Sequence, residues 1–209
     1  MTSNVDHLVY AVPDLQEGMD LVESQLGVRP AIGGRHPHLG SHNALLSLGE
    51  DVYLEVVAPD PDLPRPPRGV VFNMDGISKA HLTTWAMRAE DIQGMAKRST
   101  SGGFDVGALA QGSRQRPDGS MLHWQLSDPY VMAFGGLVPF LIAWGDSPHP
   151  AQSAPPAGRL LALEAEHPEP DTVTAALDAL GADLTVTPGP APLLRARIEG
   201  EDGRVRLLE

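Results

Sequence analysis

Hydrophobic residues in the first sixty positions follow two different periods, separated by residues that favour turns and helix ends. Residues 5–12 (V-D-H-L-V-Y-A-V) are rich in β-branched and apolar side chains, which predicts a buried strand. Asp14 then stands where a helix N-cap belongs, Glu17 follows it as in a capping box, and Gly27 is placed to end the helix. Apolar residues recur between these ends at helical spacing, at Leu15, Met19, Val22 and Leu26.

Three further apolar stretches follow the predicted helix and indicate three strands, over residues 31–36, 42–48 and 52–58. Residues 60–68 (D-P-D-L-P-R-P-P-R) contain four prolines and predict a linker, because proline continues neither a helix nor a central strand. The first unit, residues 1–60, is therefore predicted to run strand, helix, strand, strand, strand.

The same order of elements is predicted again over residues 80–146. Residues 81–89 (H-L-T-T-W-A-M-R-A) indicate a strand, and Asp91 is placed to begin a short helix, much as Asp14 is in the first unit. Three more strands are predicted over residues 104–116, 120–126 and 137–144. The turn between the first two of these is R-P-D-G, which is strong turn chemistry.

A shorter third unit is predicted after a proline-rich linker over residues 147–158. A strand over 160–165 is followed by a helix that Asp171 begins and Gly181 ends. Three strands are then predicted over residues 184–187, 193–198 and 204–208. Three similar units at this spacing indicate an internal repeat, with residues 1–146 forming a pair and residues 147–209 the linker and third unit.

Composition narrows the possible partners of this 209-residue chain. Its 27 acidic and 15 basic side chains give a net charge of −12, which would repel a phosphate backbone, so no nucleic acid partner is expected. The absence of cysteine excludes disulfides, thiolate metal sites and cysteine nucleophiles. Neither a signal peptide nor a membrane-spanning stretch is recognised, so a cytoplasmic protein with no membrane partner is expected.

Three segments carry a resemblance to a known family. They are residues 5–15 (V-D-H-L-V-Y-A-V-P-D-L), 42–59 (H-N-A-L-L-S-L-G-E-D-V-Y-L-E-V-V-A-P) and 137–150 (L-V-P-F-L-I-A-W-G-D-S-P-H-P). Together they resemble the glyoxalase-like domain family of the vicinal-oxygen-chelate superfamily. The resemblance implies an α+β fold in which paired βαβββ modules form a curved, half-open mixed β-sheet barrel around a small ligand. The third βαβββ-like unit would cap the sheet or meet a partner chain, so a homodimer is expected.

The resemblance also implies a metal site on the first and last strands of each module. In the first module those places hold His7 and Glu55, and an imidazole with a carboxylate suits divalent Fe, Mn, Ni or Zn. Such an ion would bind adjacent ligand oxygens, and Glu55 is the candidate catalytic group for moving a proton. The second module departs from this pattern, because aligning the two modules places Thr84 opposite His7 and Ile142 opposite Glu55.

Two other histidines are candidates to complete the metal site. His42 begins the strand that pairs with the Glu55 strand, and His123 lies in M-L-H-W-Q-L of the second module. Strand parity decides whether His42 faces the pocket, and a single bulge would reverse that parity. His149 follows the last strand of the second module and is expected to be a turn residue.

Several other side chains are candidate ligand contacts. Arginines can anchor an anionic ligand through paired hydrogen bonds, and tryptophans can form either the pocket wall or the core. The candidate ligand-binding residues are Arg35, Asn43, Trp85, Arg114, Arg116, Trp124 and Trp144.

Two functions from different classes are consistent with these residues. The first is a metal-dependent lyase, isomerase or ring-cleaving dioxygenase acting on a small oxygen-rich molecule, with the ion held by His7 and Glu55. The second is a metal-free binding protein, similar to the antibiotic-sequestering members of the superfamily, in which the pocket and tryptophans enclose a small-molecule ligand without chemistry. The missing ligands of the second module favour the second function, and the apposed histidine and glutamate favour the first.

Overall fold

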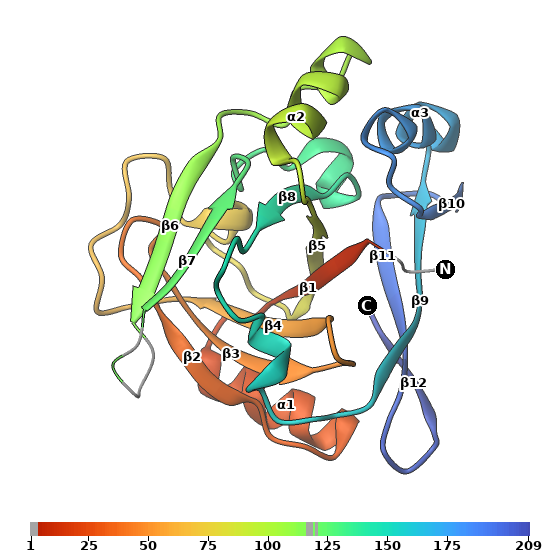
Figure 1. Cartoon of the computed structure of the whole chain (residues 1–209). Helices are drawn as coiled ribbons and strands as arrows, with labels where there is room; N and C mark the ends of the chain where they lie inside the picture. The colour runs from red at the N-terminus through yellow and green to blue at the C-terminus, as the bar shows by residue number, and fades with distance from the viewer. Residues whose placement is uncertain (1–3, 116–118, 120) are drawn as a thin grey trace.

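The fold is built from a large curved sheet, a small second sheet and three α-helices (Figure 1). It is given by a computed structural model that describes residues 4–115, 119 and 121–209. The large sheet has eight strands in the order β2-β3-β4-β1-β5-β8-β7-β6, and the small sheet has four in the order β10-β9-β11-β12. The curved sheet confirms the predicted α+β class and the paired modules.

The first module follows the predicted order closely. Its elements are β1 (Val5–Ala11), α1 (Leu15–Leu26), β2 (Ala31–His36), β3 (Ser41–Ser47) and β4 (Tyr53–Pro59). The ends of α1 are those that the sequence predicts. The side chain of Asp14 accepts a hydrogen bond from the backbone N–H of Glu17 at 3.0 Å, and Gly27 adopts the left-handed conformation with φ of 80°.

The second module repeats the order with a shorter last strand and short 3₁₀ turns around it. Its elements are β5 (His81–Arg88), α2 (Ile92–Ser101), β6 (Ala110–Gln115), β7 (Met121–Leu126) and β8 (Phe140–Ala143). The 3₁₀ turn η1 (Val71–Asn73) precedes the module, η2 (Ala133–Gly136) lies between β7 and β8, and η3 (Pro150–Gln152) follows β8. Asp91 caps α2 as predicted, accepting from the N–H of Gly94 at 2.9 Å. The strand predicted from residue 104 begins only at Ala110, because Gly103 and Gly107 have positive φ and hold the chain in turns before it.

The two modules join through their first strands. β1 and β5 pair antiparallel at the centre of the large sheet, so the strand order of the second module mirrors that of the first. The register of β1 against β5 shifts between Val5 and His7, which is a β-bulge. Downstream of this bulge the side chains alternate regularly. His7 and Val9 face the concave side of the sheet, and Leu8 and Tyr10 face the outer core.

The third unit has the predicted order of elements but a different pairing. It consists of β9 (Arg159–His167), α3 (Pro170–Leu180), β10 (Thr185–Pro188), β11 (Leu193–Glu199) and β12 (Val205–Leu208). In both modules the first strand lies at one end of the module's four strands, whereas β9 lies between β10 and β11. The predicted helix start is wrong by two residues. Glu169 is the N-cap, and Pro170 occupies the first turn, where its missing N–H costs nothing.

One continuous hydrophobic core joins the three units. Buried side chains of α1, of the outer face of β5 and of the third unit belong to the same cluster, which includes Leu8, Trp85, Leu177 and Ile198. β11 lies against β5 and α3 lies against α2 (Figure 1). The third unit therefore caps the outer face of the curved sheet, which is one of the two arrangements expected from the sequence.

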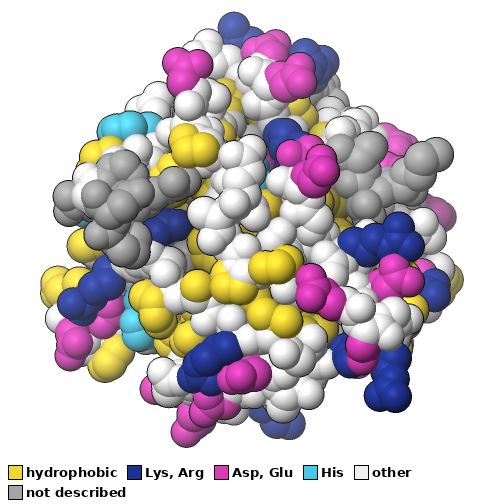
Figure 2. Space-filling view, turned by 60° about the horizontal axis from the view of Figure 1, so that its bottom comes forward, with side chains coloured by type: hydrophobic (Ala, Val, Ile, Leu, Met, Phe, Trp, Pro, Cys, Tyr) yellow, Lys and Arg dark blue, Asp and Glu magenta, His cyan; other side chains and the backbone are white. Residues whose placement is uncertain are grey.

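The surface gives little further indication of a partner. On the face shown in Figure 2, side chains of both charges surround a central strip of hydrophobic ones. None of the helices in the described part of the chain is long and apolar enough to cross a membrane.

The continuous core predicts that the chain unfolds as one unit. Leu177 is fully buried in α3, and replacing it with Ala should lower the free energy of unfolding by about 2–5 kcal/mol, through lost burial and the cavity left behind. All three tryptophans lie in the second module, so their fluorescence reports the barrel, whereas circular dichroism reports the whole chain. Leu177→Ala should lower the unfolding midpoint seen by both probes equally. The exposed Asp178→Ala is the matched control, and an unchanged fluorescence midpoint in Leu177→Ala would show instead that the third unit is a separate domain.

Candidate functional site

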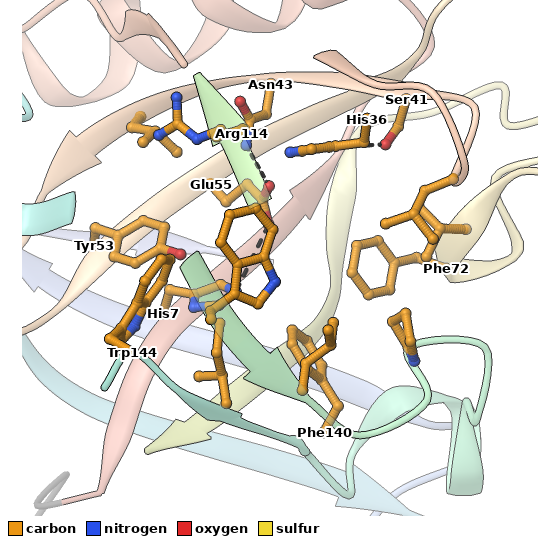
Figure 3. Close-up of a pocket in the computed structure, with 17 residues that line it drawn as sticks. His7, His36, Ser41, Asn43, Tyr53, Glu55, Phe72, Arg114, Phe140 and Trp144 are labelled. Carbon is orange, nitrogen blue, oxygen red and sulfur yellow. Dashed lines mark hydrogen bonds and ion pairs between the residues drawn. The ribbon is translucent and has the colours of Figure 1, made fainter. Parts of the chain in front are cut away.

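The concave face of the large sheet surrounds a pocket (Figure 3). The space between its lining atoms is about 560 Å³, a value that includes the part open to solvent. Polar side chains gather on the side formed by the first module and by the end of β6. They are His7, His36, Ser41, Asn43, Tyr53, Glu55 and Arg114.

The bulge in β1 gives the central histidine its partner. Adjacent side chains of a regular strand point to opposite faces, but the bulge lets Asp6 and His7 meet. Nδ1 of His7 lies 2.8 Å from Oδ1 of Asp6, and both side chains are buried. The imidazole stacks on the ring of Tyr53 at 4.5 Å between centroids and meets Phe140 edge-on at 5.4 Å. Nε2 of His7 is therefore the nitrogen directed toward Glu55 and the pocket.

Glu55 is held beside His7 by a short chain of hydrogen bonds. Nδ2 of Asn43 donates to Oε1 of Glu55 at 2.5 Å, and Oδ1 of Asn43 accepts from the backbone N–H of Gly34 at 2.9 Å. The other carboxylate oxygen, Oε2, lies 3.7 Å from Nε2 of His7. A Cβ at Gly33 would lie 2.3 Å from Oδ1 of Asn43, so this arrangement requires glycine there. One oxygen of Glu55 is fixed, and the other is available to the pocket.

Asp6 is completely buried and accepts hydrogen bonds from several donors. Nε1 of Trp144 lies 3.2 and 3.1 Å from its two oxygens, Nε2 of His149 lies 3.2 Å from Oδ2, and Nε of Arg88 lies 3.4 Å from Oδ2. Burial alone would raise the pKa of Asp6. The hydrogen bonds and charges of His149 and His7 outweigh that effect and hold the pKa well below its ordinary value. Asp6 is therefore a buried anion.

Two further side chains of the polar region stay uncharged. Burial raises the pKa of the Tyr53 phenol well above its ordinary value, and the negative charges of Asp6 and Glu55 add to this effect. Burial lowers the pKa of His36, whose Nδ1 lies 3.2 Å from Oγ of Ser41. Both groups therefore present neutral hydrogen-bonding atoms around neutral pH.

The opposite side of the pocket is apolar. Trp124 and Phe140 line it from β7 and β8, and the rings of Trp124 and Trp144 lie 5.5 Å apart. Phe72, in the linker between the modules, packs 5.7 Å from Phe140 and holds a left-handed backbone with φ of 56°. This conformation costs a residue with a side chain about 1–2 kcal/mol, and such strain is found at binding sites more often than elsewhere. The pocket thus has one hydrogen-bonding side and one aromatic side.

The fold brings six of the predicted site residues together at this pocket. They are His7, Asn43, Glu55, Arg114, Trp124 and Trp144. Arg114 reaches across from β6 and donates to the backbone carbonyl of Gly33, so it closes the seam between the two edge strands of the large sheet.

Four other predicted residues lie elsewhere, and one is outside the described part of the chain. His42 projects from the other face of β3, where Nδ1 lies 3.9 Å from Asp60, and Arg35 donates to the same carboxylate at 2.6 and 2.9 Å. The side chain of His123 is exposed. Trp85 is buried in the outer core, where its indole donates to the carbonyl of Leu137 at 2.9 Å. Arg116 lies outside the described residues.

The second module contributes no metal-binding side chain at the aligned positions. Ile142 lines the pocket, as its alignment with Glu55 predicts, and it is apolar. Thr84 is buried and donates to the backbone carbonyl of Gly136 at 2.9 Å. The symmetric backbone therefore carries an asymmetric set of side chains.

The donor set does not fit the metal ion that the family resemblance implies. Nε2 of His7 and Oε2 of Glu55 are two donors, and Asp6 lies on the opposite side of the imidazole, bound to Nδ1. Over residues 4–115, 119 and 121–209, no three His, Cys, Asp or Glu side chains converge so that they could hold an ion. Stable sites for divalent Fe, Mn, Ni or Zn use at least three protein donors.

Two residues of the site are not identified by the sequence pattern. Asp6 follows a valine in a strand, and regular alternation would direct it away from His7. The sequence predicts only a turn residue at His149, yet this side chain caps η3 and reaches Asp6. The family resemblance of the segment 137–150 is the only sequence signal that includes His149.

Asp6 predicts a dependence of stability on pH. Folding lowers its pKa, so the folded chain binds this proton less readily than the unfolded chain does. The stabilisation is therefore present above the ordinary carboxyl pKa of about 3.8 and is lost as the pH falls below it. Asp6→Asn should lower the free energy of unfolding at pH 7 by about 1–3 kcal/mol and flatten its dependence on pH between about 5 and 3.

Chemical denaturation across this pH range measures both effects. Asp178→Asn, on the exposed side of α3, is the control and should keep the slope of the parent protein. An Asp6→Asn variant with the full acid sensitivity of the parent protein would mean that other carboxylates cause it.

Comparison with known proteins identifies the family. Residues 5–181 match the family model described as a glyoxalase-like domain. A hypothetical protein from Staphylococcus aureus has a similar structure, with a TM-score of 0.66, 13% identity and 98% of each chain covered. Methylmalonyl-CoA epimerase from Mycobacterium tuberculosis has a TM-score of 0.45 and 18% identity, with 69% of this chain and 89% of that chain covered. A search of curated proteins finds no match. Because the family model covers most of the sequence, the chain belongs to the glyoxalase-like domain family.

Proposed function

We propose that the protein binds a small, oxygen-containing organic molecule in the barrel pocket and that His7 and Glu55 transfer a proton to or from it without a resident metal. One observation carries the proposal: a buried imidazole and a buried carboxylate, each oriented by a hydrogen bond on its far side, face the same cavity 3.7 Å apart. Burying such groups is costly unless they are paired, and functional sites are where such pairs concentrate.

The geometry suits a ligand oxygen or a C–H next to a carbonyl. Because Nε2 of His7 and Oε2 of Glu55 are 3.7 Å apart, one ligand atom in front of them can lie about 2.8 Å from both. That is a normal hydrogen-bond distance to each. A basic group placed in this way can accept a proton from one atom of the bound molecule and return it to another, as in general acid–base catalysis. Tyr53 and His36 supply neutral hydrogen-bonding groups around this position.

The aromatic side of the pocket indicates the rest of the ligand. Trp124, Phe140 and Phe72 offer ring surfaces, and such surfaces bind aromatic or aliphatic parts of a molecule. Arg114 lines the same cavity and adds positive potential in a chain that is otherwise acidic. The proposed ligand therefore joins an apolar body to a polar oxygen-bearing group.

Binding without chemistry is the second candidate function. It is favoured by the aromatic wall, which encloses a ligand without contributing reactive groups. The two candidates differ in the role of Glu55. If the pocket only sequesters a ligand, Glu55→Gln should keep its affinity, and no ligand should be consumed by the parent protein. A homodimer and a cytoplasmic location stay predictions from the sequence.

Ligand binding can be measured through the tryptophans in the pocket wall. A panel of α-hydroxy ketones, 2-oxo acids and catechols should include molecules that change the fluorescence of the Trp85→Phe variant, in which only Trp124 and Trp144 emit. His7→Ala should weaken binding of such a molecule at least about tenfold, the cost of one lost charge-assisted hydrogen bond.

Two histidines offer matched controls for that experiment. His42 lies on the other face of the sheet and His123 is exposed, so His42→Ala and His123→Ala should bind as the parent protein does. Equal losses in all three variants, or no loss in His7→Ala, would contradict the proposed site. Product analysis by mass spectrometry, with Glu55→Gln as the inactive comparison, then separates catalysis from sequestration.

The two-donor geometry predicts that function does not require a resident ion. Binding of the same molecule should change less than about twofold after dialysis against a chelator and after addition of Fe²⁺, Mn²⁺, Ni²⁺ or Zn²⁺. Elemental analysis of the purified protein should give a metal content well below one ion per chain. A stoichiometric ion that is lost in His7→Ala but kept in His123→Ala would contradict this prediction.

A further inference from the structure

A chain of buried hydrogen bonds runs from the proline-rich segment after the second module to the pocket histidine. We infer that Asp6 and His149 are positioning residues that fix the tautomer of His7, with the proton on Nδ1, so that Nε2 is the proton-accepting atom of the pocket. The inference rests on the proposed function and names the atom that performs it. It follows from which of the hydrogen-bonded groups can only donate and which must therefore accept.

The first step concerns the tautomer of His149. The backbone N–H of Ala151 points at Nδ1 of His149 at 3.3 Å, and a backbone N–H can only donate. Nδ1 of His149 is therefore the acceptor, and its proton lies on Nε2, which faces Oδ2 of Asp6 at 3.2 Å. The rings of Tyr53 and Trp144 pack edge-on against the imidazole at 5.5 and 5.9 Å and hold it in this orientation.

The second step concerns what Asp6 can do in return. The indole N–H of Trp144 has no acceptor function, and His149 presents a proton, so both groups only donate to the carboxylate. The guanidinium of Arg88, 3.4 Å from Oδ2, is also a donor only. A proton on Oδ2 would lie against one of these donors, so only Oδ1 could carry a proton, directed at Nδ1 of His7. The lowered pKa of Asp6 keeps that oxygen ionised as well. The carboxylate is therefore an acceptor toward every neighbour.

The third step concerns His7, whose Nδ1 faces an oxygen of Asp6 that can only accept a hydrogen bond. Oδ1 of Asp6 lies 2.8 Å from Nδ1 of His7 and must accept, so Nδ1 carries a proton. In the neutral imidazole the lone pair is then on Nε2, which faces Glu55 and the cavity. The ring cannot turn over, because it is stacked on Tyr53 and bounded by Phe140.

The segment that supplies His149 is itself fastened to the first module. The backbone N–H of Ser47 donates to the carbonyl of Pro155 at 2.8 Å, and that of Ala157 donates back to the carbonyl of Ser47 at 3.0 Å. The linker to the third unit is therefore part of the site, because it places His149 behind β1. The barrel modules alone would leave one donor to Asp6 missing.

Long-range ¹H–¹⁵N correlation spectra of the histidine rings test the inference directly, on the full chain and without any ligand. At a pH high enough that the His7 signals, assigned with His7→Gln, no longer change, they should show a protonated Nδ1 and an unprotonated Nε2. The Nδ1–H form should exceed the Nε2–H form at least about tenfold. A predominant Nε2–H form in the parent protein would overturn the inference, and this measurement needs no variant to fold.

Three variants test the two positioning residues. Asp6→Asn should raise the Nε2–H form to at least about half of the population, because an amide no longer accepts on both sides. The same exchange in the catalytic triad of a serine protease leaves its histidine in the wrong tautomer. His149→Ala should raise the Nε2–H form several-fold, and His149→Gln should restore the parent ratio by supplying a donor to Asp6. His123→Gln, at an exposed position, should leave the ratio unchanged.

The outcomes separate this inference from the proposed function. Folded Asp6→Asn and His149→Ala variants with the parent tautomer ratio would overturn the positioning roles. A purely structural role for His149 would lower stability without moving the ratio. If the ratio responds as expected and His7→Ala still binds ligand normally, the proposed function fails while the tautomer assignment stands.

Discussion

The buried carboxylate of Asp6 is the constraint on which the rest of the site depends. An unpaired charge in such a place would cost several kcal/mol, so the chain must supply donors to it. They come from three separate parts of the sequence: His7 beside it, Arg88 at the end of β5, and Trp144 and His149 after β8. The hydrogen bonds to this one carboxylate therefore connect β1, the second module and the proline-rich linker behind the pocket.

The fold could be predicted where local residues determine it. Asp14 and Gly27 mark both ends of α1 because capping is a matter of a few neighbouring residues. The family resemblance implied that Glu55 faces the pocket from the last strand of the first module, and the repeated order of elements indicated the pairing of the modules. His7 and Glu55 were therefore correctly expected on the same side of the sheet.

The rest depended on contacts between distant residues. A bulge is a property of two paired strands, so the meeting of Asp6 and His7 could not be predicted from β1 alone. The same reasoning applies to His42, because its neighbour Asn43 has the parity that faces the pocket. The third unit has the element order of a module, but its strands pair differently because β9 packs as a central strand against the outer core.

The asymmetry between the two modules explains how one pocket can combine chemistry and binding. The first module supplies most of the hydrogen-bonding groups, and the second supplies Trp124, Phe140 and Ile142, of which Ile142 stands at the position aligned with Glu55. An apolar wall faces His7 and Glu55 across the pocket, and electrostatic interactions are stronger in less polar surroundings. The second module therefore carries no metal donor at these positions and gives the pocket its apolar side, while the first module carries the hydrogen-bonding groups. Two modules with the same order of elements form a site with two unlike sides in this way.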